Sequence, residues 1–152
     1  MATDSVNAEF RRLPACAVDT EKLDIIFPCD GAASVGQVGN HVAIELTNAG
    51  GDARMCCTTA VGAGSEQHVG IGKRARRVIV INGCANRCAS KVMEQRGVEV
   101  DHEYVIAKMG VSKISTLDFG EADVARIAAQ IAQEVGLTPP AAKEVSRNNL
   151  VI

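Results

Sequence analysis

The chain has few aromatic residues and no long hydrophobic run. Its 152 residues include one tyrosine, three phenylalanines and no tryptophan. Proteins that bind single-stranded nucleic acid stack bases on aromatic side chains, so this composition argues against such a partner. No apolar stretch approaches the roughly 18 residues that a membrane-spanning helix needs. Residues 1–22 contain acids and lack the apolar segment of a signal peptide, so we expect no membrane partner and a cytoplasmic location.

The chain also lacks a strong excess of charge of either sign. Its 16 Lys and Arg and 18 Asp and Glu residues give a formal net charge of −2, too small to attract nucleic acid or anionic lipid. Hydrophobic residues make up 47% and charged residues 22%, which is typical of globular proteins. A chain of this length can fold as one domain without disulfides or a structural metal.

Six cysteines are present. In a reducing compartment thiols remain unpaired, which favours metal ligands or redox thiols over disulfides. The alternative is that they are small buried hydrophobic residues, as unpaired cysteines often are. Their positions along the predicted elements help to distinguish these interpretations.

Strands and helices alternate through the middle of the chain. Hydrophobic patterns predict strands over 23–28, 52–57, 77–81 and 102–107, and helices over 34–49, 65–75, 84–96 and 121–135. Ser34 and Gln37 have the spacing of a capping box. Residues 58–64 are small and predict a loop. The alternation is typical of an α/β fold, a small open parallel sheet with helices on both faces.

We expect this α/β domain to span residues 24–137, between an N-terminal extension over 1–23 and a C-terminal tail over 138–152. Right-handed crossovers place the carboxyl ends of all strands at one edge of the sheet, where ligands bind in such folds. The loops after the first three strands converge only if those strands are neighbours. The expected order is therefore second, first, third, fourth strand.

Four cysteines fall at this edge. Cys29 follows the first strand, Cys57 ends the second, Cys84 follows the third, and Cys88 lies one predicted helical turn beyond Cys84. Zinc accepts four thiolates in a tetrahedron, so these residues form a candidate zinc site. Four thiolates also hold iron–sulfur clusters.

A thiol enzyme or redox protein is a further alternative for the same cysteines. Predicted helix starts near Ser34 and Cys84 direct positive partial charge toward the edge and favour thiolates. Cys29 is then the best candidate nucleophile. His68 is a nearby residue that we expect on the solvated surface, and Lys91 and Lys113 are cations that could approach the thiolates. The basic run Lys73, Arg74, Arg76 and Arg77 is typical of a solvated helix end.

The sequence resembles the DGC-domain family, proteins described as zinc-binding and named for an Asp-Gly-Cys motif. The matching stretches are Phe27–Gly31 with Gly36-Gln37, Met55–Cys57, Ile81–Cys84 with Cys88-Ala89, and Gly110–Lys113. The resemblance implies a four-cysteine zinc site at Cys29, Cys57, Cys84 and Cys88, and it implies no activity.

Two features depart from a simple match to that family. Asn82 stands where the naming motif has Asp, which would alter any role of that position in orienting a ligand. Cys56 and Cys57 are adjacent, and only one of two consecutive strand residues can face a site. Cys57 fits the family spacing better, while Cys16 lies in the extension and matches no motif.

Overall fold

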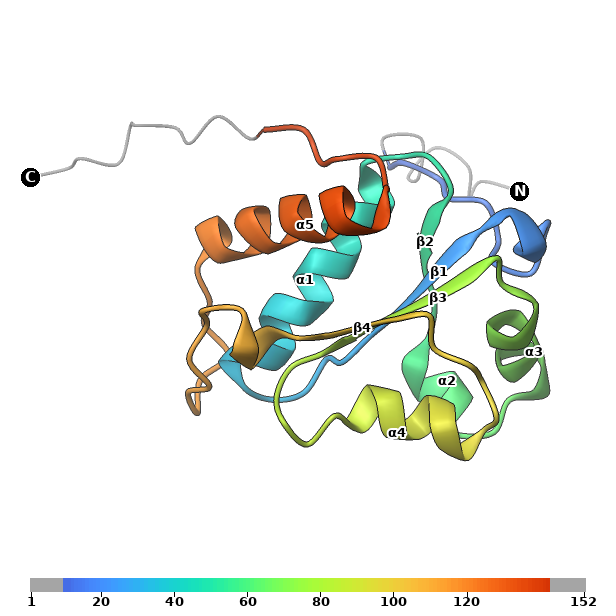
Figure 1. Ribbon diagram of the computed structural model, residues 1–152, viewed down its shortest axis with the longest axis horizontal. Helices are drawn as coiled ribbons and strands as arrows, with labels where there is room; N and C mark the ends of the chain where they lie inside the picture. Colours follow the sequence, from blue (N-terminus) through green and yellow to red (C-terminus); the bar gives the residue numbers. More distant parts are fainter. Residues whose placement is uncertain (1–9, 143–152) are drawn as a thin grey trace, which may run out of the picture.

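The sheet has four parallel strands in the computed structural model, which describes residues 10–142. They are β1 (Asp24–Pro28), β2 (Ala53–Met55), β3 (Arg77–Asn82) and β4 (His102–Val105), in the order β2-β1-β3-β4 (Figure 1). This confirms the predicted fold class and strand order. β1 and β3 lie in the interior of the sheet and are formed mainly by buried β-branched residues, as expected of strands covered on both faces.

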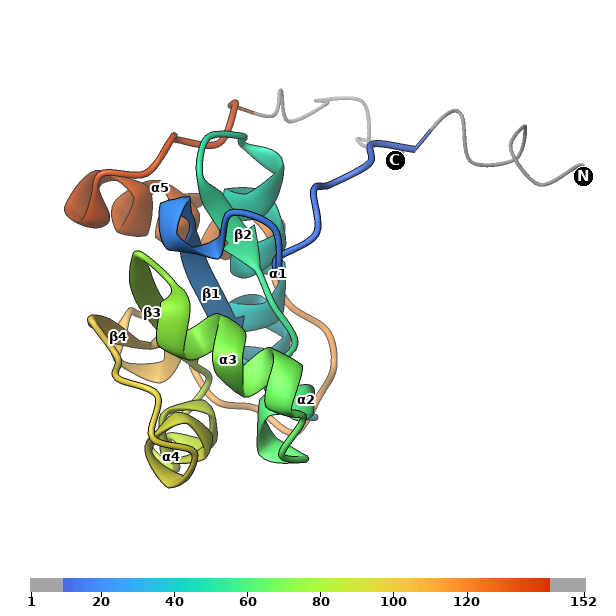
Figure 2. The same cartoon turned by 90° about the vertical axis from the view of Figure 1, so that its right-hand side faces the viewer.

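Helices cover both faces of the sheet (Figures 1 and 2). One layer consists of α1 (Ser34–Asn48) and α5 (Glu121–Val135), and the other of α2 (Thr58–Gly62), α3 (Glu66–Arg74) and α4 (Cys88–Gln95). Two short 3-10 helices, η1 (Thr20–Lys22) and η2 (Ile106–Lys108), precede β1 and follow β4. Strand alternation sends Ile26 into the first layer and its neighbours Ile25 and Phe27 into the second. Each such buried side chain contributes about 2 kcal/mol of hydrophobic stabilisation.

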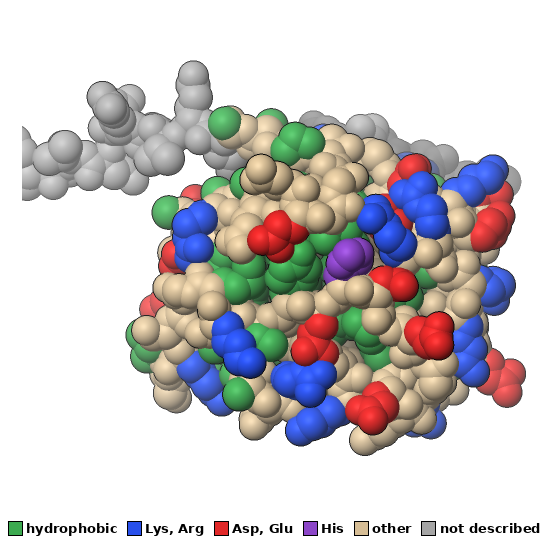
Figure 3. All heavy atoms as spheres, viewed as in Figure 1, with side chains coloured by type: hydrophobic (Ala, Val, Ile, Leu, Met, Phe, Trp, Pro, Cys, Tyr) green, Lys and Arg blue, Asp and Glu red, His purple; other side chains and the backbone are tan. Residues whose placement is uncertain are grey.

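The surface carries charges of both signs. Figure 3 shows acidic and basic side chains interspersed over one face, in keeping with the small net charge of the sequence. Within residues 10–142, no helix is both long and apolar enough to cross a membrane.

Residues 58–62 form the helix α2, so the prediction of a loop over 58–64 was wrong. Val61 is fully buried in the apolar cluster beneath α3 and α4. Five small residues give little sequence pattern of their own, and packing against the neighbouring helices decides the conformation.

The predicted start of α4 at Cys84 was also wrong, because the helix begins at Cys88. The amide of Arg87 donates to the carbonyl of Cys84 at 3.0 Å, and Arg87 has a φ of 51°. A non-glycine residue in this left-handed region interrupts a helix. Cys84 and Cys88 therefore do not share one helical turn.

The capping box predicted at Ser34 and Gln37 does not form. The hydroxyl of Ser34 donates to the carbonyl of Ser112 and accepts the amide of Ile114, both at 2.8 Å. The side-chain amide of Gln37 donates to the backbone carbonyls of Asp30 and Gly31 at 3.1 and 3.2 Å. These two side chains thus join the start of α1 to the loops beside it.

Asp24 anchors the amino-terminal end of β1. Its side chain is only 2% exposed, and Arg76 and Arg77 both donate to its carboxylate at distances between 2.6 and 3.0 Å. Burial raises the pKa of the Asp24 carboxyl, but the hydrogen bonds from Arg77 and Arg76 outweigh it and lower that pKa to about 2. Two members of the basic run therefore form ion pairs with a buried carboxylate, which the prediction of a solvated helix end missed.

We expect Asp24→Asn to lower the free energy of unfolding by about 2 kcal/mol at pH 7, because it removes charged hydrogen bonds from a buried group. The folded pKa lies below the unfolded value near 4, so this contribution is present above pH 4 and is lost as the pH falls through about 2. Urea denaturation measures this, and the difference in free energy of unfolding between wild type and Asp24→Asn should be smaller at pH 3 than at pH 7.

Asp52→Asn is the matched control for this substitution. The Asp52 side chain is 58% exposed and lies 3.4 Å from Arg76, so its loss should cost at most about 0.5 kcal/mol. An Asp24→Asn variant as stable as this control would contradict the anchoring role.

Candidate functional site

The four cysteines predicted as ligands all lie in segments that follow β1, β2 and β3. Cys29 comes directly after β1, and its amide donates to the carbonyl of Ile81 at 2.8 Å. Cys57 and Cys84 are each the second residue after their strand, and Cys88 is the first residue of α4. Parallel strands thus bring all four segments to one edge of the sheet.

Cys29 and Cys88 line the same cavity of about 340 Å³ at this edge, between the end of β1, α2 and α4. Cys57 lines an adjoining hollow of about 80 Å³, and both spaces are bordered by Asp30 and Thr58. The hydroxyl of Thr58 donates to the carbonyl of Pro28 at 2.8 Å, which joins the segment of Cys57 to that of Cys29. Three of the four thiols therefore surround the start of α2.

Cys84 lies apart from that group. It packs against the apolar cluster between the sheet and α1 and α5, whereas Cys29 packs against the cluster on the other face. In the part of the chain that the structure describes, no three His, Cys, Asp or Glu side chains lie close enough together to hold one metal ion. The edge thus carries the predicted donors without bringing their sulfurs to one point.

Hydrogen-bond donors lie beside two of these sulfurs. The amide of Gly31 donates to the sulfur of Cys29 at 3.3 Å. The ammonium group of Lys113 lies 3.6 Å from the sulfur of Cys84, as the sequence allowed. Each contact directs a hydrogen-bond donor at the sulfur.

Two glycines bring the loops of this edge into backbone contact. A Cβ atom on Gly83 would lie 2.9 Å from the backbone nitrogen of Gly36, and one on Gly36 would lie 2.3 Å from the carbonyl oxygen of Gly31. Only glycine fits both positions. The Cys29 loop, the first turn of α1 and the segment leading to Cys84 are therefore packed directly against one another.

Asn82, which stands where the family motif has Asp, is fully buried and holds α4 against β4. Its amide nitrogen donates to the hydroxyl of Ser90 at 2.8 Å and to the carbonyl of Tyr104 at 3.3 Å, and its oxygen accepts the amide of Ser90 at 3.1 Å. The hydroxyl of Ser90 donates in turn to Glu103, which is ion-paired with Arg87. In this chain the position has a structural role.

Cys56 and Cys57 point to different environments. Cys56 is 6% exposed and belongs to the apolar cluster under α2, α3 and α4, while Cys57 is exposed. Cys57 is therefore the one of the pair that is accessible at the edge.

No pattern in the sequence indicates that Cys16 lies near Cys56. The sulfur of Cys16 donates to the carbonyl oxygen of Met55, the residue before Cys56, at 3.6 Å, and Cys16 and Cys56 line the same cavity. A hydrogen bond from Cys56 lowers the pKa of Cys16 to about 6. Burial opposes this shift, and the positive charge of Arg54 adds to it. The same bond, together with burial, raises the pKa of Cys56.

A cavity of about 410 Å³ opens onto this pair. It is lined by Cys16, Cys56, Cys57 and His68. His68 is half-buried and its Nδ1 lies 2.8 Å from the hydroxyl of Ser65. His68 is therefore a surface residue that is partly shielded from solvent, because α3 places it beside the end of β2.

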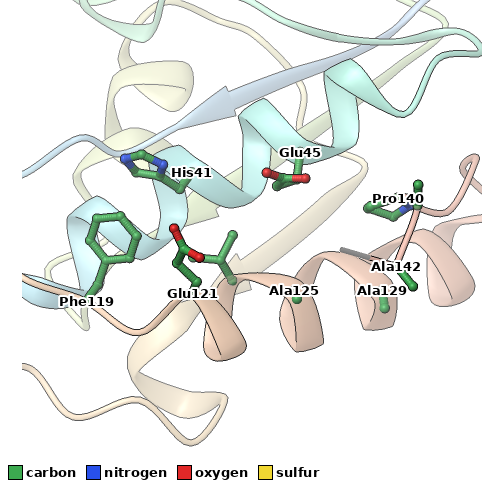
Figure 4. Close-up of a pocket in the computed structure, with 10 residues that line it drawn as sticks. His41, Glu45, Phe119, Glu121, Ala125, Ala129, Pro140 and Ala142 are labelled. Atoms are coloured by element: carbon green, nitrogen blue, oxygen red, sulfur yellow. The ribbon is translucent and has the colours of Figure 1, made fainter. Parts of the chain in front are cut away.

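Another cavity, of about 340 Å³, lies between α1 and α5, away from the strand ends (Figure 4). His41 and Glu45 border it from α1, and Glu121 borders it from α5. The rings of His41 and Phe119 are 4.4 Å apart and close one end. Its remaining lining is largely small and apolar, and it offers no nucleophile for the thiol chemistry predicted from the sequence.

We expect Asn82→Asp to destabilise the protein by about 3 kcal/mol at pH 7, although it restores the Asp-Gly-Cys motif. A carboxylate cannot donate to the carbonyl of Tyr104, and Ser90 already links the position to Glu103. Burial raises the pKa of the introduced acid, so the loss should shrink as the pH falls toward 4. Urea denaturation at pH 7 and pH 4 measures this, with the exposed Asn86→Asp as control. Unchanged stability at pH 7 would contradict the structural role of Asn82.

Alkylation of Cys16 by iodoacetamide should reach half its maximal rate near pH 6, because the thiolate is the reacting form. In Cys56→Ala the donor is lost, so the midpoint should move up toward the ordinary value for cysteine, about 8.5. Peptide mass spectrometry of residues 13–22 after timed alkylation gives the rate at Cys16 alone. An unchanged midpoint in the variant would show that Cys56 does not stabilise this thiolate.

Comparison with protein-family models matches residues 25–131 to the DGC domain. Searches of curated proteins and of solved structures found no match to the chain. The matched residues run from β1 to within α5 and include Cys29, Cys57, Cys84 and Cys88, while Cys16 lies outside them. Because the match covers most of the sequence, the chain belongs to the DGC-domain family.

Proposed function

We propose that this DGC domain binds a zinc ion through Cys29, Cys57, Cys84 and Cys88. The observation that supports the proposal is the position of these four unpaired thiols, which all follow adjacent parallel strands at the ligand-binding edge of the sheet. Thiolate sulfur is a preferred donor for zinc, and four such donors complete its tetrahedral coordination. Zinc bound in this way would link the three loops covalently through metal–sulfur bonds.

Binding requires Cys84 to turn away from the α1–α5 layer toward the cavity shared by Cys29 and Cys88. Cys84 lies in a turn that precedes α4, so this movement does not require the helix to unwind. A site with four thiolates and Zn²⁺ carries a charge of about −2. Lys113, which already contacts the sulfur of Cys84, would offset part of that charge.

The contact between Lys113 and Cys84 also favours a second candidate function, thiol chemistry without a resident metal. In that case Cys84 acts as a nucleophile beside the ammonium group of Lys113, and the amide of Gly31 donates to the sulfur of a second reactive thiol, Cys29. Such a protein would react with alkylating agents at these thiols regardless of added zinc. A protein with a zinc-bound site would be protected from them.

The proposal is tested by elemental analysis of purified protein with and without added zinc. We expect about one zinc per chain in wild type and well below one in Cys84→Ser, because three thiolates hold zinc less tightly than four. Cys16→Ser is the matched control, since Cys16 lies outside the proposed ligand set, and it should retain zinc as wild type does.

Full metal retention in Cys84→Ser would contradict the proposed coordination. A metal-free wild-type protein in which Cys84 and Cys29 alkylate readily would support the thiol candidate instead. A brown colour and bound iron after anaerobic purification would identify an iron–sulfur cluster on the same cysteines.

A further inference from the structure

The segment that precedes β1 is fastened to the end of β2. The guanidinium group of Arg54 donates to the carbonyl of Pro14 at 3.0 Å, and the hydroxyl of Thr20 donates to the carbonyl of Cys16 at 2.7 Å. Figure 2 shows this part of the chain running beside β2 before it enters β1. These contacts place the Cys16 sulfur 3.6 Å from the carbonyl oxygen of Met55, the residue before Cys56, and Cys16 and Cys56 line the same cavity.

The two thiols differ in access to solvent. Cys16 is partly exposed and borders the 410 Å³ cavity, so a small reagent can reach its sulfur. Cys56 lies beneath it at 6% exposure, among the apolar side chains of the core. Arg54, on β2, contributes positive charge near the Cys16 sulfur. A partly exposed thiol beside a cation, backed by a buried thiol, has the arrangement of an attacking and a resolving cysteine.

We propose that Cys16 and Cys56 form a redox-active dithiol that hydrogen peroxide converts into an intramolecular disulfide. The Cys16 thiolate attacks one peroxide oxygen, the O–O bond breaks, and the leaving hydroxide takes a proton to become water. This leaves a sulfenic acid on Cys16. The sulfur of Cys56 then attacks the Cys16 sulfur, the S–O bond breaks, and a second water leaves. Overall, two thiols and one peroxide give one disulfide and two waters, and a small dithiol reductant restores both thiols.

The position of Cys16 makes this disulfide easy to close. Residues 14–19 lie outside helices and strands, so the Cys16 side chain can approach Cys56 without disrupting the sheet. The new bond would tie the N-terminal segment to the residue before Cys57. The inference does not depend on zinc binding, because neither thiol belongs to the proposed ligand set.

The full-length protein is treated with a small excess of hydrogen peroxide, blocked with an alkylating agent and digested with trypsin without reduction. The expected product joins the peptide of residues 13–22, which contains Cys16, to that of residues 55–73. The second peptide contains both Cys56 and Cys57, so Cys57→Ala serves as the matched control for Cys56→Ala. The cross-link should form in wild type and Cys57→Ala, and it should be absent from Cys56→Ala and Cys16→Ala.

A cross-link that survives in Cys56→Ala but disappears in Cys57→Ala would overturn the proposal, as would its absence from oxidised wild type. A disulfide between two chains, seen as a dimer on a non-reducing gel, would overturn it too. If the buried Cys56→Ala variant does not fold, the partly exposed Cys16→Ala variant still tests the pair. Zinc content is measured in the same Cys16→Ala variant, so that zinc binding and disulfide formation are tested independently. Retained zinc together with loss of the cross-link supports both proposals.

Discussion

The packing of Gly36 against Gly83 sets the geometry of the carboxyl edge of the sheet. With no side chain on either residue, the first turn of α1 lies directly on the segment that leaves β3. Gly31 completes the contact on the other side of α1. A methyl group at Gly36 or Gly83 would push these segments apart, and with them the loops that carry Cys29 and Cys84. The packing of the segments that carry Cys29 and Cys84 thus depends on a contact made by backbone alone.

The amino-terminal end of the sheet is fixed by charge. Asp24 is buried at the start of the strand that lies between β2 and β3. Of its two arginine partners, Arg77 begins β3 and Arg76 directly precedes it. This holds β1 and β3 in register at one end, while the glycine contact holds their continuations together at the other. Side chains along both strands then alternate between two apolar layers.

The sequence was sufficient to predict the features that depend on a repeating hydrophobic pattern. The strands predicted over 23–28 and 77–81 contain the apolar runs 25–28 and 78–81, and the stripe over 121–135 matches α5 at both ends. The strand order followed from the cysteines themselves, because their loops converge only if the first strand lies between the second and third. Periodicity and topology therefore predicted the architecture and the edge on which the candidate site lies.

Features decided by single contacts were not predictable in this way. The turn over 84–87 depends on one left-handed residue, Arg87, in a stretch that otherwise has helical spacing. The helix over 58–62 depends on burial of Val61 by neighbouring helices. Cys16 meets Cys56 only because Arg54 holds a segment without periodicity against β2. Each of these requires knowledge of neighbours far apart in the sequence.

The adjacent residues Cys56 and Cys57 show how one short segment can serve two kinds of chemistry. Consecutive side chains in an extended segment point to opposite sides, so the first lies in the core beside Cys16 and the second is exposed beside the hollow next to Cys29. The two thiols are therefore in different environments, although their residues are adjacent. In the two proposals, the exposed thiol therefore serves the zinc site at the sheet edge, and the buried thiol serves the dithiol with Cys16.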